Sequence, residues 1–287
     1  MTNHALANHA LTNNVMREAS MPSSVKAIVS ICLVIFILTP VPTSAMGGAS
    51  GSAVDSSPLP PSITNAPLSV DQVVANLIRK DEDRARALRH YESNRLYHLS
   101  YRGFPGDRDA EMTVEASYDS PSTKKFKIIS QKGSKLIIDR VFKRLLESEK
   151  EAVEPEMHAR TLLNRENYDM ALVGFESSDK GNQYVLEVCP KSKNKYVYRG
   201  KVWVDATDFA VTRIDAEPAQ NPSFWTKKNE VHHEYMKVQN FWLPRRNESI
   251  SYIRLGGRAT LTIDYSNYRV NDAQTSASKS SSRTSVR

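Results

Sequence analysis

The sequence predicts an α+β domain built on one curved antiparallel sheet of about nine to eleven strands, with two helical segments. Many short segments alternate apolar and polar residues and are separated by turns rich in Gly, Pro, Asn and Asp, which is typical of strands joined by hairpins. Two other segments repeat apolar residues with a helical period. Strands joined in order form a meander, and such a sheet is expected to curl so that its edges are protected.

Residues 1–45 carry the features of a secretory signal peptide. Lys26 precedes an apolar run at 27–38, and Thr43 and Ala45 are the small residues expected before a cleavage site. The run is shorter than the roughly 20 residues that a membrane-spanning helix needs. We therefore expect cleavage and export, with an uncleaved segment that tethers the chain to the inner membrane as the alternative.

Two further segments lack hydrophobic periodicity. Residues 46–67 are rich in Gly, Ser and Pro and are predicted to be a flexible linker, and residues 273–287 are predicted to be a disordered tail. The folded domain is therefore expected over residues 68–272.

Charge and cysteine content limit the function classes. The formal net charge is +7, and loss of the signal peptide, with two basic residues and one acidic residue, changes it to +6. This excess suits an anionic membrane surface or an acidic envelope protein, and it is far below that of a nucleic-acid-binding protein. Cys189 would be the one remaining cysteine, and its apolar surroundings predict a buried structural thiol.

The first helix is expected to begin at Ser69, which forms a capping box with Gln72. Its apolar stripe consists of Val70, Val73, Val74 and Leu77. The arginines that follow are expected to form its solvated side: Arg79, Arg84, Arg86 and Arg89.

The remaining elements follow from the same patterns. Alternation predicts strands at 95–101, 111–118, 124–130, 170–176, 184–189, 196–204, 209–216, 230–239, 242–254 and 258–270. A second helical segment is predicted at 139–153, ended by Pro155 and followed by a short helical turn at 156–163.

The hairpin at 199–215 has apolar residues on both faces. If residues 205–208 form its loop, Val204 lies opposite Phe209 and Val202 opposite Val211, and these four side chains share one face. The other face then receives Trp203, Ala210 and Ile214. Apolar residues on both sides indicate a curved sheet with material in its hollow.

Catalytic and metal-binding motifs are scarce. His232 and His233 are followed by Glu234, but no HExxH motif is present, and neighbours on a strand point to opposite faces. We interpret them as surface or edge-strand histidines. The sequence predicts no enzyme activity, no metal site and no cofactor; a hydrolase would require clustered carboxylates or a Ser/His pair in the hollow.

Aromatic and basic residues are the candidate binding residues. Large apolar side chains in loops either plug a core or line a cavity, and the cavity candidates are Trp203, Phe224, Trp225, Phe241 and Trp242. The segment 191–201 interleaves basic and aromatic residues. Its candidates for membrane or partner contact are Lys191, Lys193 and Lys195, with a solvated hairpin tip as the alternative.

Five motifs follow one another in the second half of the domain. They are Tyr184-Val-Leu-Glu-Val188, Tyr198-Arg-Gly-Lys-Val-Trp-Val-Asp205, Ala210-Val-Thr-Arg-Ile214, Asn240-Phe-Trp-Leu-Pro244 and Leu261-Thr-Ile-Asp-Tyr265. In this order they resemble the LolA/LolB-type family of outer-membrane lipoprotein-sorting proteins and their broader exported relatives. The resemblance extends over about residues 68–270.

The resemblance implies a half-open β-barrel of about eleven strands with covering helices. It implies a periplasmic, monomeric carrier without a cofactor, which sequesters acyl chains of lipids or lipoproteins in an apolar cavity. The alternative on the same fold is an envelope-sensing protein-interaction or regulatory module. Carriers of the family gate their lid with an arginine of an early strand; Arg95 and Arg102 lie in that region, and neither is assigned the role.

Overall fold

A computed structural model describes residues 67–121, 123–151, 161–178, 181–193, 197–221, 224, 226–254 and 256–272. The predicted signal peptide and tail, nearly all of the linker and most of the predicted turn at 156–163 lie outside the described residues, as do Trp225 and Lys195.

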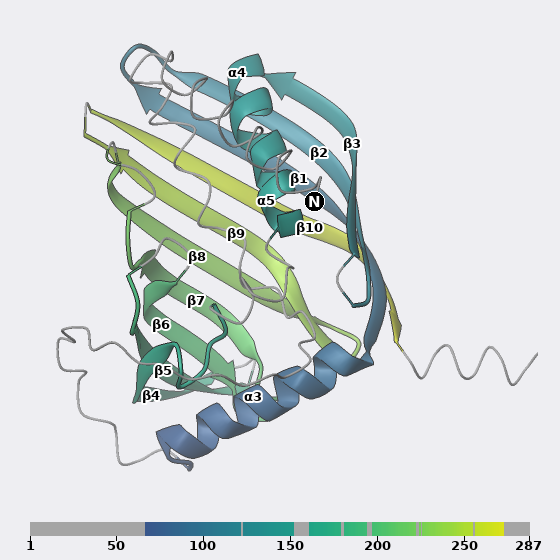
Figure 1. The fold of residues 1–287 in the computed structure, drawn as a ribbon, viewed down its shortest axis with the longest axis vertical. Helices are drawn as coiled ribbons and strands as arrows, with labels where there is room; N and C mark the ends of the chain where they lie inside the picture. The colour runs from purple at the N-terminus through teal and green to yellow at the C-terminus, as the bar shows by residue number, and fades with distance from the viewer. Residues whose placement is uncertain are drawn as a thin grey trace, which may run out of the picture.

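The described chain forms one antiparallel sheet of ten strands, in the order β3-β2-β1-β10-β9-β8-β7-β6-β5-β4 (Figure 1). The strands are β1 Leu88–Gly103, β2 Arg108–Asp119, β3 Thr123–Gly133, β4 Tyr168–Ser178, β5 Gly181–Pro190, β6 Tyr198–Asp205, β7 Val211–Pro218, β8 Thr226–Val238, β9 Phe241–Ile253 and β10 Gly257–Asp272. Strands that follow one another along the chain pair as hairpins, except β3 and β4, and β1 also pairs with β10. β3 and β4 are the two edges, so the curved sheet stays open. The predicted α+β class and half-open architecture are confirmed, with ten strands.

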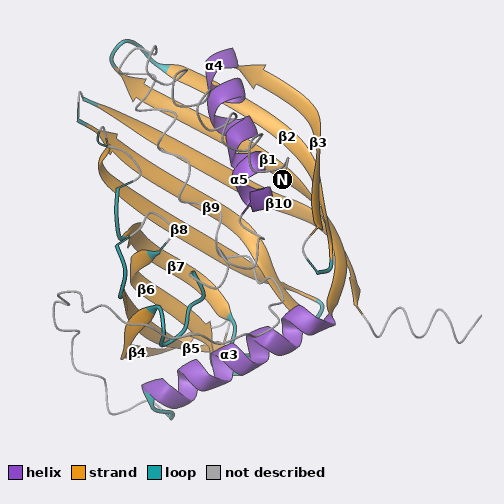
Figure 2. Cartoon of the chain, viewed as in Figure 1, coloured by secondary structure: helices purple, strands orange, loops and turns teal. Residues whose placement is uncertain are grey.

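The helices pack on one side of this sheet (Figure 2). α3 spans Val70–Ala87, and a continuous helical run consists of α4 Lys135–Ile137, the π-helix η1 Ile138–Phe142 and α5 Lys143–Glu151. We call the run from Lys135 to Glu151 the lid helix. It begins four residues before the predicted segment, because Ile137 and Ile138 are also buried against the sheet.

α3 confirms the predicted capping box, in which the backbone N–H of Gln72 donates to Ser69 Oγ and that of Ser69 donates to Gln72 Oε1. The prediction of a fully solvated arginine side is wrong at Arg84. Its guanidinium donates to the backbone carbonyl oxygens of Asp208 and Phe209, at 2.9 and 3.0 Å. Arg84 therefore fastens α3 to the β6–β7 loop, whereas Arg89 belongs to β1 rather than to the helix.

Direct cross-strand pairs place one row of side chains on the helix-covered face. From β4 to β2 the row reads Leu172, Leu186, Val202, Ile214, His233, Asn247, Ile263, Tyr97 and Met112. The lid helix covers the row at β10, β1 and β2, and α3 covers it at β4 to β7. Only the two residues of β8 and β9 are strongly polar.

The β6–β7 hairpin corrects the predicted register. Val204 pairs with Val211 and Val202 pairs with Ile214, because an irregularity interrupts the ladder between Trp203 and Val204. The carboxylate of Asp205 accepts the backbone N–H groups of Thr207 and Asp208, and this turn lengthens the loop to include Phe209 at φ 47°. Ile214 consequently shares the face of Val202 rather than that of Trp203.

Candidate functional site

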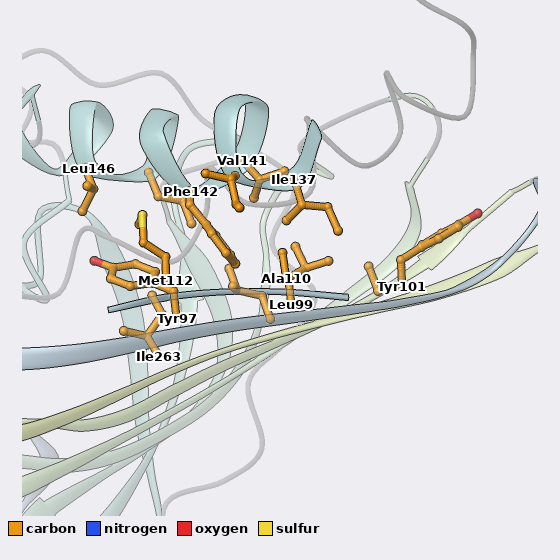
Figure 3. Close-up of a cluster of buried hydrophobic side chains, with 14 of the residues drawn as sticks. Tyr97, Leu99, Tyr101, Ala110, Met112, Ile137, Val141, Phe142, Leu146 and Ile263 are labelled. Atoms are coloured by element: carbon orange, nitrogen blue, oxygen red, sulfur yellow. The ribbon is translucent and has the colours of Figure 1, made fainter. Parts of the chain in front are cut away.

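The lid helix and the strands beneath it form the first apolar cluster (Figure 3). Val141, Phe142 and Leu145 of the lid helix face the sheet and are buried. The ring of Phe142 lies 5.9 Å from that of Tyr97, centroid to centroid. The sheet side is also apolar and includes Leu99, Met112, Val114, Leu261 and Ile263. This part of the sheet would present an apolar surface if the lid helix moved away.

A buried ionic cluster fastens the end of the lid helix to the sheet. Glu149 Oε2 lies 2.6 Å from Arg95 Nη1 of β1, and Glu149 Oε1 lies 3.0 Å from Lys124 Nζ of β3. All three side chains are at most 2% exposed. The Arg95 guanidinium also lies over the rings of Phe126 and Tyr265, at 5.3 and 5.1 Å.

The charges of this cluster depend on one another. Burial alone would raise the pKa of Glu149, but the cations of Arg95 and Lys124 outweigh burial and hold it below its ordinary value. Burial would likewise lower the pKa of Arg95, and Glu149 keeps it raised. Removal of one partner therefore leaves an uncompensated buried charge, which is strongly destabilising.

Of the two early arginines, Arg95 is the one that contacts the lid helix. Arg102 is half-exposed, donates to the Asp109 carboxylate through Nη1 and Nη2 and lies at the far end of β1. The sequence could not separate the two, because the decisive partner, Glu149, is 54 residues away from Arg95 along the chain.

Between the two helix-covered regions, β8 and β9 carry a band of buried polar side chains. We call Thr226, Asn229, Ser249 and Ser251 the polar band; each is at most 1% exposed. The hydroxyls of Ser249 and Ser251 both donate to Asn229 Oδ1, at 2.9 and 2.8 Å. The polar band was not predicted from the sequence, where it is visible only as Ser at alternate positions of one strand.

His233 and His232 point to opposite faces, as predicted, but His233 is not at the surface. It is buried on the helix-covered face, and its Nδ1 lies 2.7 Å from Asn247 Oδ1, while Asn247 Nδ2 donates to the hydroxyl of Tyr265. Burial is the main reason that the pKa of His233 falls to about 4. His232 instead lies 2.9 Å from the carboxylate of Asp215.

The aromatic cavity candidates lie in different places. Trp203 pairs with Val185 and Arg213, and its ring stacks with the Arg213 guanidinium on the face opposite to the row. Phe241 is buried in a third apolar cluster with Leu88, Tyr91, Tyr118, Leu243 and Val270. The indole of Trp242 donates to Asp208 Oδ2 at 2.8 Å. The structure therefore brings no two of them together at one site among the described residues.

Phe224 lies at an exposed end of the sheet rather than in the interior. It is 75% exposed, and the Arg254 guanidinium lies 5.2 Å from its ring centroid. Phe104, in the β1–β2 turn, is 72% exposed. Both turns lie at the same end, because Gly103 pairs with Gly257 and Thr226 pairs with Ile253. From the sequence, residues 103–106 were predicted only to form a turn.

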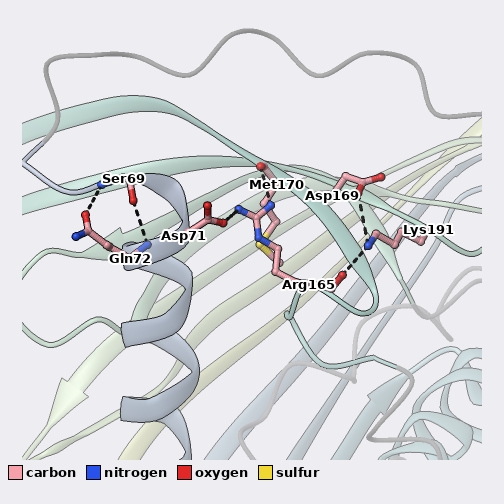
Figure 4. A network of polar contacts seen from close by, with 7 residues as sticks. All are labelled: Ser69, Asp71, Gln72, Arg165, Asp169, Met170 and Lys191. Atoms are coloured by element: carbon pink, nitrogen blue, oxygen red, sulfur yellow. Dashed lines mark hydrogen bonds and ion pairs between the residues drawn. The ribbon is translucent and has the colours of Figure 1, made fainter. Parts of the chain in front are cut away.

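The lysine candidates Lys191 and Lys193 follow β5 and lie at the same end of the sheet as these turns. Lys191 Nζ donates to the backbone oxygen of Arg165 at 2.7 Å and lies 3.7 Å from Asp169 (Figure 4). Arg165 in turn contacts Asp71 of α3, so Lys191 helps to fasten the start of β4. Lys193 is exposed. We call Phe104, Lys191, Lys193, Phe224 and Arg254 the turn rim.

Other sites are not evident in the part of the chain that the structure describes. Its helices include none long and apolar enough to cross a membrane. Its His, Cys, Asp and Glu side chains form no group of three placed to hold a metal ion. Cys189 is buried, as predicted, and unbonded to sulfur.

No protein-family model matches the sequence, and no curated protein matches it. Solved structures do match. A DUF1329 family protein from Desulfovibrio piger is 16% identical with a TM-score of 0.37, over 71% of this chain and 93% of that one. A putative outer membrane lipoprotein-sorting protein domain from Vibrio parahaemolyticus is 11% identical with a TM-score of 0.34, over 70% and 91%. A LolA superfamily protein from Nitrosomonas europaea is 11% identical with a TM-score of 0.31, over 71% and 94%. The structures to which this chain is similar thus include members of the family that its sequence motifs resemble.

Proposed function

We propose that this protein is a periplasmic carrier that sequesters acyl chains of lipids or lipoproteins against the helix-covered face of its sheet. The observation that carries the proposal is the lid helix, which covers an apolar sheet surface in an open half-barrel. Its apolar contacts with the strands are of the kind that an acyl chain can replace. The function requires binding and release and no bond-making chemistry.

Binding is expected to exchange the lid helix for an acyl chain. The side chains of Val141, Phe142 and Leu145 leave the sheet, and methylene groups take their place. Each buried methylene contributes about 0.8 kcal/mol, so a 16-carbon chain contributes roughly 10 kcal/mol before ordering costs. This contribution acts against the cost of moving the lid helix from the sheet.

Two features of the lid helix bear on its movement. η1 is a π-helical segment inside the lid helix, and such segments are frequent at functional sites. The ionic cluster of Glu149, Arg95 and Lys124 opposes movement, and because Glu149 makes both contacts, displacement of α5 breaks them together. We propose that Arg95 holds the lid helix in its closed position.

The proposal is tested by displacement of a fluorescent acyl probe. The purified protein is expected to bind the probe in a saturable manner, and a diacyl phospholipid is expected to displace it. Leu145→Ser weakens lid packing and should raise the apparent affinity several-fold, because the lid costs less to remove. Glu147→Gln, on the exposed side of the same helix, is the matched control. Absence of saturable binding by all three proteins contradicts the proposal.

We further propose that the turn rim contacts an anionic membrane surface during lipid exchange. Exposed aromatic rings flanked by cations are favourable at the lipid–water interface. The alternative, an envelope-sensing regulatory module, would use the same rim for a protein partner. A partner that binds the delipidated protein through Lys193 would favour that alternative.

A further inference from the structure

The polar band is a buried group of four polar side chains in the middle of the sheet. It consists of neutral side chains on the two central strands β8 and β9, and it lies on the helix-covered face between apolar neighbours. Ser251 pairs across the strands with Asn229 on one side and Ala259 on the other, and Ser249 pairs with Val231 and Leu261. Across the strands the band is thus flanked by apolar residues, and along β9 it continues into Asn247.

The band has unused hydrogen-bond donors. Asn229 Oδ1 accepts both serine hydroxyls, and Asn229 Nδ2 has no partner among the described residues. Thr226 Oγ1 also lacks one there. Asn229 is 1% exposed and Thr226 is 0% exposed. Buried donors without partners are costly and uncommon, so two of them close to paired serines call for an explanation.

The chemistry of the band selects its ligand. None of its four side chains carries a charge, so a buried ion there would have no opposite charge beside it. A neutral acceptor oxygen needs only a hydrogen-bond donor. The apolar clusters on both sides require that hydrocarbon extend from this acceptor. An ester carbonyl next to two acyl chains meets both requirements.

We propose that the polar band is the subsite for the ester carbonyl groups of a diacyl lipid. Asn229 Nδ2 and Thr226 Oγ1 donate to the carbonyl oxygen, and the acyl chains extend over the apolar surfaces on either side. The inference rests on the proposed function and adds the class of ligand. A ligand that lacks the carbonyl leaves both donors unpaired and is bound more weakly.

The test compares a diacyl phosphatidylglycerol with its dialkyl ether analogue, which has the same chains and headgroup but no carbonyl. Each lipid competes with the fluorescent acyl probe for the purified protein. The wild-type protein is expected to prefer the ester about tenfold. Asn229→Leu is expected to abolish the preference while the ether lipid still binds.

The other outcomes are distinct. Equal affinity of the wild-type protein for ester and ether, or an unchanged preference in Asn229→Leu, overturns the subsite and leaves the carrier proposal intact. Failure of both lipids and of the probe to bind the wild-type protein overturns the carrier proposal instead. Thr226→Val has nearly the shape of the original residue and should reduce the preference several-fold, so it replaces Asn229→Leu if that variant does not fold.

Discussion

Single residues of the helix-covered face carry the strongest predictions, because several are charged or titratable and yet buried. Glu149 joins the lid helix to two strands, and His233 is neutral in the middle of the sheet. Neither could be selected from the sequence. Glu149 belongs to a charged, exposed-looking helix, and His233 has the same local context as His232, which is half-exposed.

Glu149→Gln should lower the free energy of unfolding by about 3 to 5 kcal/mol at pH 7, because Arg95 and Lys124 lose the anion between them. Urea denaturation measures the loss. Glu147→Gln, on the exposed side of the lid helix, should change stability by less than about 0.5 kcal/mol. Equal effects of the two substitutions would show that the cluster does not hold the lid.

The ionic cluster also predicts that the wild-type protein loses folding stability in acid. Since the pKa of Glu149 is lowered on folding from its ordinary 4.5, its stabilising contribution is present above pH 4.5 and is lost as pH falls through the lowered value.

His233 predicts a second pH dependence, in a separate range. Its pKa of about 4 in the folded protein lies below its ordinary 6.5, so the unfolded chain takes up the proton first as pH falls. Its contribution is complete above pH 6.5 and is lost between about pH 6.5 and 4, with a loss of about 2 kcal/mol by pH 5. His233→Gln should unfold in urea with a shallower pH dependence over this range. An unchanged slope would contradict the assignment.

At the scale of elements, predictability followed the range of the interactions. The capping box and apolar stripe of α3 are local, so the sequence predicted both correctly. The predicted register of the β6–β7 hairpin was wrong because the turn at Asp205 includes Phe209. The positive φ of Phe209 cannot be inferred from the alternation of apolar and polar residues. The turn rim is also non-local, since Phe104 and Phe224 lie at the same end of the sheet only through the pairing of β1, β10, β9 and β8.

The turn rim predicts a membrane phenotype. Replacement of both Phe104 and Phe224 by Ser should weaken association with vesicles that contain phosphatidylglycerol by roughly tenfold or more, because two exposed rings no longer enter the interface. Vesicle co-sedimentation measures it, and high salt should weaken the wild-type association. Leu96→Ser, at a 42% exposed position in the middle of β1, should have no such effect. Loss of binding in this control would indicate that the rim is not specific.

For the whole molecule, the order of strands was predictable and the distribution of chemistry over the face was not. Alternation and turns indicated a meander of about the right size, since each strand carries its own pattern. The pairing of β1 with β10 joins residues more than 150 positions apart, such as Tyr97 and Ile263, and it aligns a row that is apolar on both sides of a polar centre. Of the aromatic candidates, Phe241 alone is a member of a buried apolar cluster.

Photolabelling can show whether an acyl chain takes the place of the lid helix on the sheet. A diacyl phospholipid with a diazirine in one acyl chain is bound to the purified protein and irradiated, and the labelled peptides are mapped by mass spectrometry. We expect labels on β1, β2 and β10, at residues that the lid helix covers, such as Leu99, Met112 and Leu261. Labels confined to exposed positions such as Leu96 and Ile129, or no specific labels, would contradict this expectation.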